Sequence, residues 1–559
     1  MIISKRTIAL VISLIMLLSL AVACTSAPGT PSVSSGGSSP AASPSGGGAS
    51  PAAPSQSAAA PPSPSSTMAE PPPTNPEVKF AEHIELILDG TTIGVLNFNS
   101  PAGSGPSPNN LQKVVYDTLL NEALNEDGSA WIAVPMLAKS WESDDFQRYI
   151  FHLRDDVVFH NGDKFTAEDV VFTCIYSRDN PGSQANNFWQ YVTDITALDD
   201  YTLQIDLRAV MPDYPDIVTS HFTGILNKRA IDADPEKGIW IGTGAFKVVE
   251  FQPNDYVILE RNDNYWEAPV PTKSMAWRFV PEASARTIML QNGTSDICLG
   301  ISETDMDMFD ADPNFEVHSL THNFPNGIHF NMEDPIMADK NFRYAVLYAI
   351  DREEITLAAQ GAWGVVETEG TVWGYRTRFR NRALPFIEQD LDKAKAYLAA
   401  SIYNGEVLEL VTANANNVRG SEVLQNQLSR IGINTEINQM DTPGFSAYTL
   451  DGDTQLIFWS AQLNTSISGV RSAFYPGIAN NRARYNNPEV NEMLDRGLTM
   501  TDEVAREALY LRVQEIIADD LPVINVFYRV TTAVAADGVG GVTLTPSVTD
   551  LRYLYKVID

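Results

Sequence analysis

The chain has 559 residues and a formal net charge of −32, from 38 Lys and Arg against 70 Asp and Glu. This acidic excess argues against nucleic-acid binding, which requires clustered basic side chains. Hydrophobic residues make up 44% and charged residues 19%, as in ordinary globular proteins, and the length is too great for one hydrophobic core.

The first 23 residues have the pattern of a targeting signal. Lys5 and Arg6 supply positive charge, an apolar stretch runs from Ile8 to Val22, and a small residue precedes Cys24. The pattern resembles a bacterial lipoprotein signal, which implies that Cys24 is the lipidated first residue of the mature protein. Ordinary secretion by cleavage nearby, with Cys24 incidental, is the alternative.

Residues 24–76 consist mainly of Ser, Pro, Ala and Gly and carry almost no charge. Such a segment buries too little apolar surface to offset its ordering entropy, so we expect a disordered tether. As a flexible coil its ~50 residues span about 40 Å on average. We therefore expect a protein lipid-anchored to the outer face of the cell membrane, in the cell wall or periplasmic space.

The run from Tyr149 to Phe172 predicts two short strands around a polar turn, followed by a helix. Thr166 is the expected helix cap, and Glu168 and Asp169 fall in the first turn, where the helix dipole favours negative charge. Nothing in this run is catalytic. It closely resembles the N-terminal signature of bacterial family 5 extracellular solute-binding proteins, which capture peptides, nickel and other solutes for ABC importers.

Three later segments resemble the same family in the same order. Residues 242–266 predict a glycine turn and a hairpin of two alternating strands. Residues 283–297 predict a short helix, a glycine stop and a strand. Residues 342–355 predict a single amphipathic helix.

The next part of the chain alternates helices and strands. We expect helices at 390–400 and 421–431, strands at 407–412 and 433–437, and a buried strand at 521–528. A strand, helix and strand in succession imply parallel pairing in an α/β lobe.

The resemblance implies an α/β fold: a two-lobed, periplasmic-binding-protein-like clamp with discontinuous domains and an extra side domain. Lobe I would consist of 77–125, 240–325 and 525–559, its side domain of 126–239, and lobe II of 326–524. The solute would lie in the cleft between the lobes.

Cys174 and Cys298 are the remaining cysteines. They fall in separate segments, the side domain and lobe I itself, so we expect two buried free thiols rather than a disulfide. His152 and His160 belong to the family signature and are expected to be structural.

No metal site is expected at His318, His322 and His329, whose spacing does not predict convergence. The common phosphate-binding, metalloprotease and serine-hydrolase motifs are absent from the sequence. We predict neither catalysis nor a cofactor, and a surface hydrolase is the enzymatic alternative.

Aromatic residues mark the expected ligand site. The Trp373-Gly-Tyr375 loop resembles one that dipeptide-binding relatives carry before an Asp-x-x-Lys-Ala helix. Phe458-Trp-Ser-Ala-Gln-Leu463 resembles the Gly-Trp-x-x-Asp segment of the family's peptide site, which implies that Trp459 and Gln462 line the site. Core packing is the alternative for each aromatic residue.

The charged residues with which relatives bind the two ends of a free peptide are missing at the corresponding positions of this sequence. Gln462 stands where peptide-binding relatives have an Asp that pairs with the α-ammonium, and a neutral amide cannot supply that charge-assisted bond. Asn414 and Asn416 occupy the stretch where relatives place an Arg for the peptide carboxylate, and Arg419 comes a few places late. Arg471 is the candidate substitute as anion anchor, and an ordinary surface arginine is the alternative. Amides and aromatics suit either a peptide backbone or an oligosaccharide stacked on Trp459.

These patterns together predict the substrate-binding lipoprotein of an ABC importer, with a peptide as the first choice of solute. Solute would bridge the lobes and stabilise the closed state, and the closed monomer would dock on membrane permease subunits. An oligosaccharide or metal-chelate binder, and a sensor or adhesin without transport, are the alternatives.

Overall fold

The computed structural model describes residues 72–73, 77–89, 106–180, 183–267, 270–451, 454–460, 467–478, 480–545 and 548–558. The predicted signal segment and Cys24 lie outside the described residues, as do nearly all of the predicted tether and Gln462.

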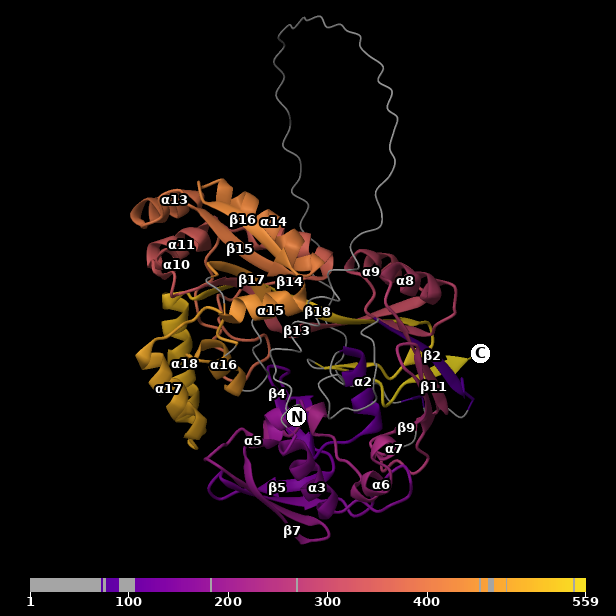
Figure 1. The fold of residues 1–559 in the computed structure, drawn as a ribbon. Coiled ribbons are helices and arrows are strands. Elements are labelled where there is room, and N and C mark those ends of the chain that lie inside the picture. The colour runs from indigo at the N-terminus through magenta and orange to yellow at the C-terminus, as the bar shows by residue number, and fades with distance from the viewer. Residues whose placement is uncertain are drawn as a thin grey trace, which may run out of the picture. The chain divides into compact units, whose positions relative to one another are not determined.

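One large mixed sheet contains half of the described strands and runs through β13 and β18 (Figure 1). Its path is β16 (Asn434–Met440), β15 (Val407–Ala413), β17 (Leu456–Ser460), β13 (Phe315–Phe330), β18 (Val523–Ala536), β12 (Ile297–Leu299), β2 (His83–Asp89), β11 (Ser274–Val280), β10 (Tyr256–Arg261) and β9 (Phe246–Gln252), with β14 (Val365–Val366) beside β18.

A four-stranded antiparallel sheet is separate from the large one and has its own hydrophobic cluster. Its strands are β5 (Ala138–Glu142), β6 (Arg148–Leu153), β8 (Thr202–Leu207) and β7 (Val192–Asp199). Smaller sheets pair β1 (Lys79–Phe80), β22 (Tyr555–Ile558) and β19 (Val539–Gly540); β20 (Thr543–Leu544) and β21 (Thr549–Asp550); and β3 (Leu120–Leu124) and β4 (Trp131–Pro135).

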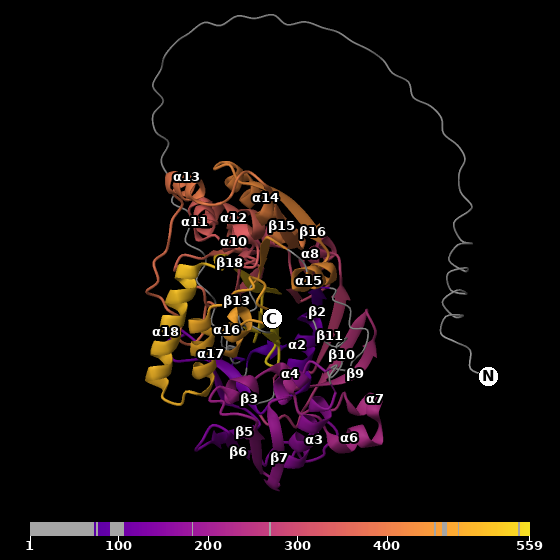
Figure 2. The same ribbon diagram turned by 60° about the vertical axis from the view of Figure 1, so that its left-hand side comes forward.

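The helices that precede β13 are α2 (Pro106–Val115), α3 (Ala167–Arg178), α4 (Asn186–Trp189), α5 (Tyr214–Ile217), α6 (Lys228–Ala233), α7 (Pro235–Gly238), α8 (Ala283–Gln291) and α9 (Glu303–Asp310). Those that follow β13 are α10 (Pro335–Ala338), α11 (Lys340–Ala349), α12 (Arg352–Gln360), α13 (Leu391–Ala400), α14 (Ala415–Ser429), α15 (Thr442–Asp451), α16 (Ile467–Phe474), α17 (Pro488–Thr499) and α18 (Glu503–Asp520). Figure 2 shows α17 and α18 side by side, in yellow.

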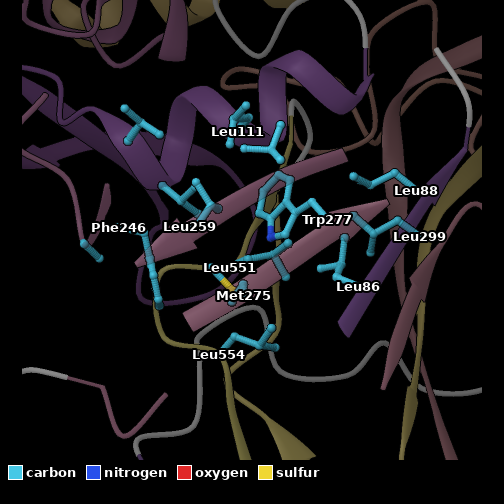
Figure 3. Packing of buried hydrophobic residues seen from close by; sticks show 14 of the residues in the cluster. Leu86, Leu88, Leu111, Phe246, Leu259, Met275, Trp277, Leu299, Leu551 and Leu554 are labelled. Atoms are coloured by element: carbon cyan, nitrogen blue, oxygen red, sulfur yellow. The ribbon is translucent and has the colours of Figure 1, made fainter. Parts of the chain in front are cut away.

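The core on the β2–β11 side of the large sheet is built around Trp277. Figure 3 shows this indole among Leu86 and Leu88 of β2, Leu111 of α2 and Leu259 of β10. Strands β2 and β11 pair in parallel, and their side chains are buried over most of their length. Each fully buried Leu contributes about 1.5–3 kcal/mol by leaving water.

Most of the predicted elements are confirmed. The hairpin expected at 242–266 is β9 and β10, and the helix at 283–297 is α8, followed by Gly293 at φ 73° and then β12. The helix after the signature run begins at the expected cap, where the carboxylate of Asp169 accepts the backbone N–H of Thr166 at 3.0 Å.

Three predictions are wrong in detail. The second strand of the signature run is reduced to one bridge, between Val158 and Lys164. The single helix expected over 342–355 is two helices, because Ile350 is extended and the Asp351 side chain caps α12 by accepting the N–H of Glu354. Helix α14 begins six residues earlier than the expected start at 421, at a cap formed by Asn414.

Cys174 and Cys298 are both buried free thiols, as expected, and burial raises the pKa of each to about 12. In the described part of the chain, no helix has the length and apolar character needed to cross a membrane. The large sheet is continuous across strands assigned to lobe I and strands assigned to lobe II, and the division into lobes and side domain stays a prediction.

Candidate functional site

Two parallel strands of the large sheet end where the predicted site residues begin. Strands β15 and β17 are neighbours, so Asn414 and Ser460 come at the same edge of the sheet. Asn326 of β13 pairs with Ser460, and its buried amide nitrogen has no hydrogen-bond partner in the described structure. Ligands of open α/β sheets bind at the carboxyl ends of the strands, which makes this edge the candidate solute site.

The asparagines at this edge are held by the start of α14. Asn414 is exposed at φ 59°, and its side chain caps the helix by accepting the N–H of Asn417 at 2.9 Å. Asn416 accepts a hydrogen bond at 2.9 Å from the guanidinium of Arg419, which also donates to the carbonyls of Ala358 and Ala359. Arg419 is therefore committed to the fold, while Asn414 stands at the exposed carboxyl end of β15.

Trp459 is half-buried near the end of β17, with its ring centroid 4.5 Å from that of Phe445 on α15. The Nε2 of His329 lies 3.3 Å from the carbonyl oxygen of Trp459. Burial, together with the charge of Arg482, lowers the pKa of His329 to about 4, so its imidazole is neutral at pH 7 and can donate to that carbonyl. This contact fixes the backbone that carries Trp459.

The Trp373-Gly-Tyr375 loop contacts the two long strands β13 and β18. Tyr375 donates its backbone N–H to the carbonyl of Asn323 in β13 at 3.3 Å, and its ring centroid lies 5.3 Å from that of Tyr528 in β18. A Cβ on Gly374 would lie 2.7 Å from two atoms of Asn323, so only glycine fits this approach. Asn323 can serve the loop because the pairing of β13 with β18 is interrupted between Thr321 and Pro325.

Trp373 itself is fully buried and packs edge to face against Tyr510 of α18, with ring centroids 5.9 Å apart. Tyr375 is only half-buried. The contacts of Trp373 are those of a core residue, and its role as a ligand contact stays a prediction.

Arg471, the predicted anion anchor, already has an acidic partner. Its guanidinium donates to Asp495 at 2.9 Å and lies 3.6 Å from the ring centroid of Tyr475. An arginine held in this way is less suited to a ligand anion, and its site role also stays a prediction.

Sequence reasoning missed two other arginines near the site, Arg376 and Arg482. Both are half-buried, and neither forms an ion pair with any described residue. No sequence signal distinguishes them from the arginines beside them, because the difference lies in which side chains have carboxylates within reach.

The histidines have structural contacts. His160 accepts the N–H of Gly242 at 3.3 Å through Nδ1, and its Nε2 lies 3.0 Å from the carbonyl of Gly244. Across the residues that the structure describes, no three His, Cys, Asp or Glu side chains form a group able to hold a metal ion.

Comparison with known proteins identifies the family. Residues 133–477, more than half of the chain, match the model of the bacterial extracellular solute-binding proteins, family 5. The chain belongs to this family. Its expected identity as an extracellular solute-binding protein is therefore confirmed, and so is the two-lobed fold class.

Relatives in this family carry names for different solutes. The chain is 28% identical to heme-binding protein A of Haemophilus influenzae over 80% of its own length and 88% of the relative's. It is 26% identical to di/tripeptide-binding protein 1 of Pseudomonas aeruginosa over 76% of the chain and 86% of the relative. Among solved structures, the ABC transporter substrate-binding protein CtaP of Listeria monocytogenes matches with a TM-score of 0.77 at 24% identity, over 86% of this chain and all of that one.

Proposed function

We propose that this family 5 protein captures peptides outside the cell and delivers them to the permease of an ABC importer, without catalysing a reaction. The observation that carries the proposal is the sheet edge at β15 and β17, where exposed Asn414 and half-buried Trp459 stand together at the carboxyl ends of two parallel strands. Amide groups pair with peptide N–H and C=O groups, and an aromatic face covers apolar side chains. The names of several relatives support the peptide assignment.

The identity of the bound solute is the direct test. The full chain is purified from membranes of a host bacterium without denaturation, and its bound ligand is measured by native mass spectrometry. A ladder of peptide masses supports the proposal. A single non-peptide mass, such as an oligosaccharide or a metal chelate, overturns the peptide assignment in favour of those alternatives.

Trp459 provides a residue-level test of the same site. Trp459→Ala is expected to weaken solute binding at least about tenfold, because a buried aromatic face is worth more than 1 kcal/mol when it contacts a ligand. Trp459→Phe keeps an aromatic ring against Phe445 and serves as the matched control. Unchanged affinity in the Ala variant, with an unchanged melting temperature, removes Trp459 from the site.

Lipidation of Cys24 is the second part of the proposal and explains how the protein stays near its permease. A lipid on Cys24 would hold the protein at the membrane. The Ser/Pro/Ala/Gly tether after it would let the solute-binding lobes move within the reach of a flexible chain. Cys24→Ala should move the protein from the membrane fraction to the soluble fraction while solute binding is unchanged. A variant that stays membrane-bound disproves the anchor.

A further inference from the structure

Arg482 is half-buried, and none of the described carboxylates pairs with it. Its guanidinium forms one hydrogen bond to a described residue, from a terminal nitrogen to the hydroxyl of Thr449 at 2.8 Å, while its backbone N–H donates to the carbonyl of Asn480. Burial lowers the pKa of its guanidinium, with no acidic group to offset that effect. A cation that is partly withdrawn from water and has no anion near it is costly for the folded protein.

Nearby arginines in the same part of the chain do have acidic partners. Arg484, two residues further on, lies 3.7 Å from Glu333 and also donates to the carbonyl of Leu450. Arg471 pairs with Asp495. With a net charge of −32 the chain has carboxylates in excess, so the isolation of Arg482 is a property of its place in the fold.

The Phe445 ring connects Arg482 to Trp459. The guanidinium carbon of Arg482 is 5.4 Å from the ring centroid of Phe445, and the Phe445 ring in turn packs against Trp459. The charge of Arg482 also acts on His329, which contacts the Trp459 carbonyl.

We propose that Arg482 is a specificity-determining residue that binds a carboxylate of the solute beside Trp459, which rests on the proposed function of peptide capture. A guanidinium offers paired donors that match the two oxygens of a carboxylate. The carboxylate is either a terminal group or an acidic side chain of the peptide. Its binding supplies a counter-ion that no described residue provides, and Arg482 takes the role of anion anchor that the sequence predicted for Arg471, which is paired with Asp495.

Arg376, next to the Trp373-Gly-Tyr375 loop, is also half-buried and has no described carboxylate paired with it. It follows Tyr375 directly, and its guanidinium carbon lies 5.6 Å from that ring. One terminal nitrogen is buried without a hydrogen-bond partner, whereas Arg378, two residues on, pairs with Glu503. Among the predicted site residues, the two half-buried aromatics are Tyr375 and Trp459, and each has near it a guanidinium that no described carboxylate pairs with. Arg376 is thus the second contact for an acidic peptide.

The test compares two probes on the full chain. A tryptic digest of casein supplies peptides with free carboxyl groups, and the same digest after methyl esterification supplies peptides whose carboxyl groups are neutral. The shift in melting temperature is recorded against probe concentration for the wild type, for Arg482→Gln and for the matched control Arg484→Gln. Arg484 has its own acidic partner, so its substitution changes the net charge equally without removing the proposed contact.

The free-acid digest should stabilise the wild type and the Arg484→Gln variant, and esterification should raise the half-saturating concentration at least about tenfold. Arg482→Gln should show a loss of about tenfold or more with the free-acid digest and little further loss with the ester, since a hydrogen bond to a charged group is being removed. Equal stabilisation of the wild type by both digests overturns the role of Arg482 and leaves peptide capture intact. Stabilisation by neither digest overturns peptide capture, and the carboxylate contact with it.

Discussion

The regions around Arg552 and Arg482 differ in whether the fold provides an acidic partner for the guanidinium. Arg552 is almost fully buried and donates to both oxygens of Asp550, at 3.0 and 2.6 Å, and lies 3.6 Å from Asp117. The side chain of Arg482 is half-buried, and among the described residues its guanidinium has the hydroxyl of Thr449 as its one hydrogen-bond partner. A buried charge that stabilises the fold is paired with a counter-ion of the same chain. We infer that a half-buried charge without such a counter-ion binds a ligand.

The Arg552 region is a closed network. Asp117 accepts hydrogen bonds from Trp266 at 3.0 Å, Thr243 at 3.0 Å and Tyr265 at 3.2 Å, while burial raises its pKa. Burial alone would raise the pKa of Asp550 too, but the charge of Arg552 brings it below its ordinary value. Every charge in the network has a partner of the chain, which leaves nothing for a ligand to complete.

Breaking that network should have the largest effect on the free energy of unfolding. Asp550→Asn removes the main counter-ion of Arg552 and should destabilise the protein by about 3–5 kcal/mol, because a buried charge is left uncompensated. Urea denaturation of the full chain measures the loss. Asp232→Asn is the matched control, since Asp232 belongs to an exposed pair with Lys228 worth about 0.3–0.5 kcal/mol. A loss below about 1 kcal/mol would show that the two regions do not differ as argued.

The ion pair between Asp213 and Arg506 sharpens the comparison, because it is buried but joins residues 293 apart in the chain, one in the predicted side domain and one in predicted lobe II. Asp213→Asn should cost about 2–4 kcal/mol, less than the Asp550 variant since Arg506 keeps its bond at 2.7 Å to the carbonyl of Gly497. Amide hydrogen exchange on α5 and α18 should rise in this variant. Glu503→Gln, which removes the more exposed pair with Arg378, should leave exchange unchanged.

The elements of this fold were largely predictable from the sequence, because hydrophobic period and cap residues are local. The hairpin at 242–266, α8 with its glycine stop, and the strands around α14 follow from such patterns. The break between α11 and α12 was not predicted from the sequence. The apolar run continues through Ile350, so the pattern does not indicate that Asp351 caps a new helix.

The candidate site was only partly predictable. A motif can place Trp459 and Asn414 at strand ends, but it cannot say that Trp373 is enclosed by α18 or that Arg471 is held by Asp495. It also cannot identify Arg482, which stands out because no described carboxylate lies close to it in the folded chain. Pairing between distant side chains is the information that a single sequence lacks.

Asp216 offers a smaller, pH-dependent test of the charged contact around Asp213. Burial and the repulsion from Asp213 raise the pKa of Asp216 from 3.8 to about 6, against weaker opposite effects of Arg378 and Arg506. Its carboxyl group accepts the backbone N–H of Ala133 at 3.3 Å.

The sign of this effect follows from proton binding. Because the folded state binds the Asp216 proton more tightly, this group's stabilising contribution is fully present below pH 3.8 and is lost as pH rises through 6. At ~1.4 kcal/mol per pKa unit, the loss is on the order of 1–3 kcal/mol. The stability curve of Asp216→Asn should lack this slope, so the stability of the wild type relative to the variant should fall as pH rises from 4 to 7. Parallel curves between pH 4 and 7 would contradict the assignment.

The smallest effect is expected at Arg482, and it is the one that separates the two regions most clearly. Without ligand, Arg482→Gln should leave the free energy of unfolding unchanged or raise it by up to about 1 kcal/mol, because an uncompensated charge is replaced by an amide that can still bond Thr449. Urea denaturation of ligand-free protein gives the value, with Arg484→Gln as the control. A loss of 3 kcal/mol or more would mean that Arg482 supports the fold as Arg552 does. A neutral or positive change, together with weakened binding of acidic peptides, would mean that its charge is kept for the solute.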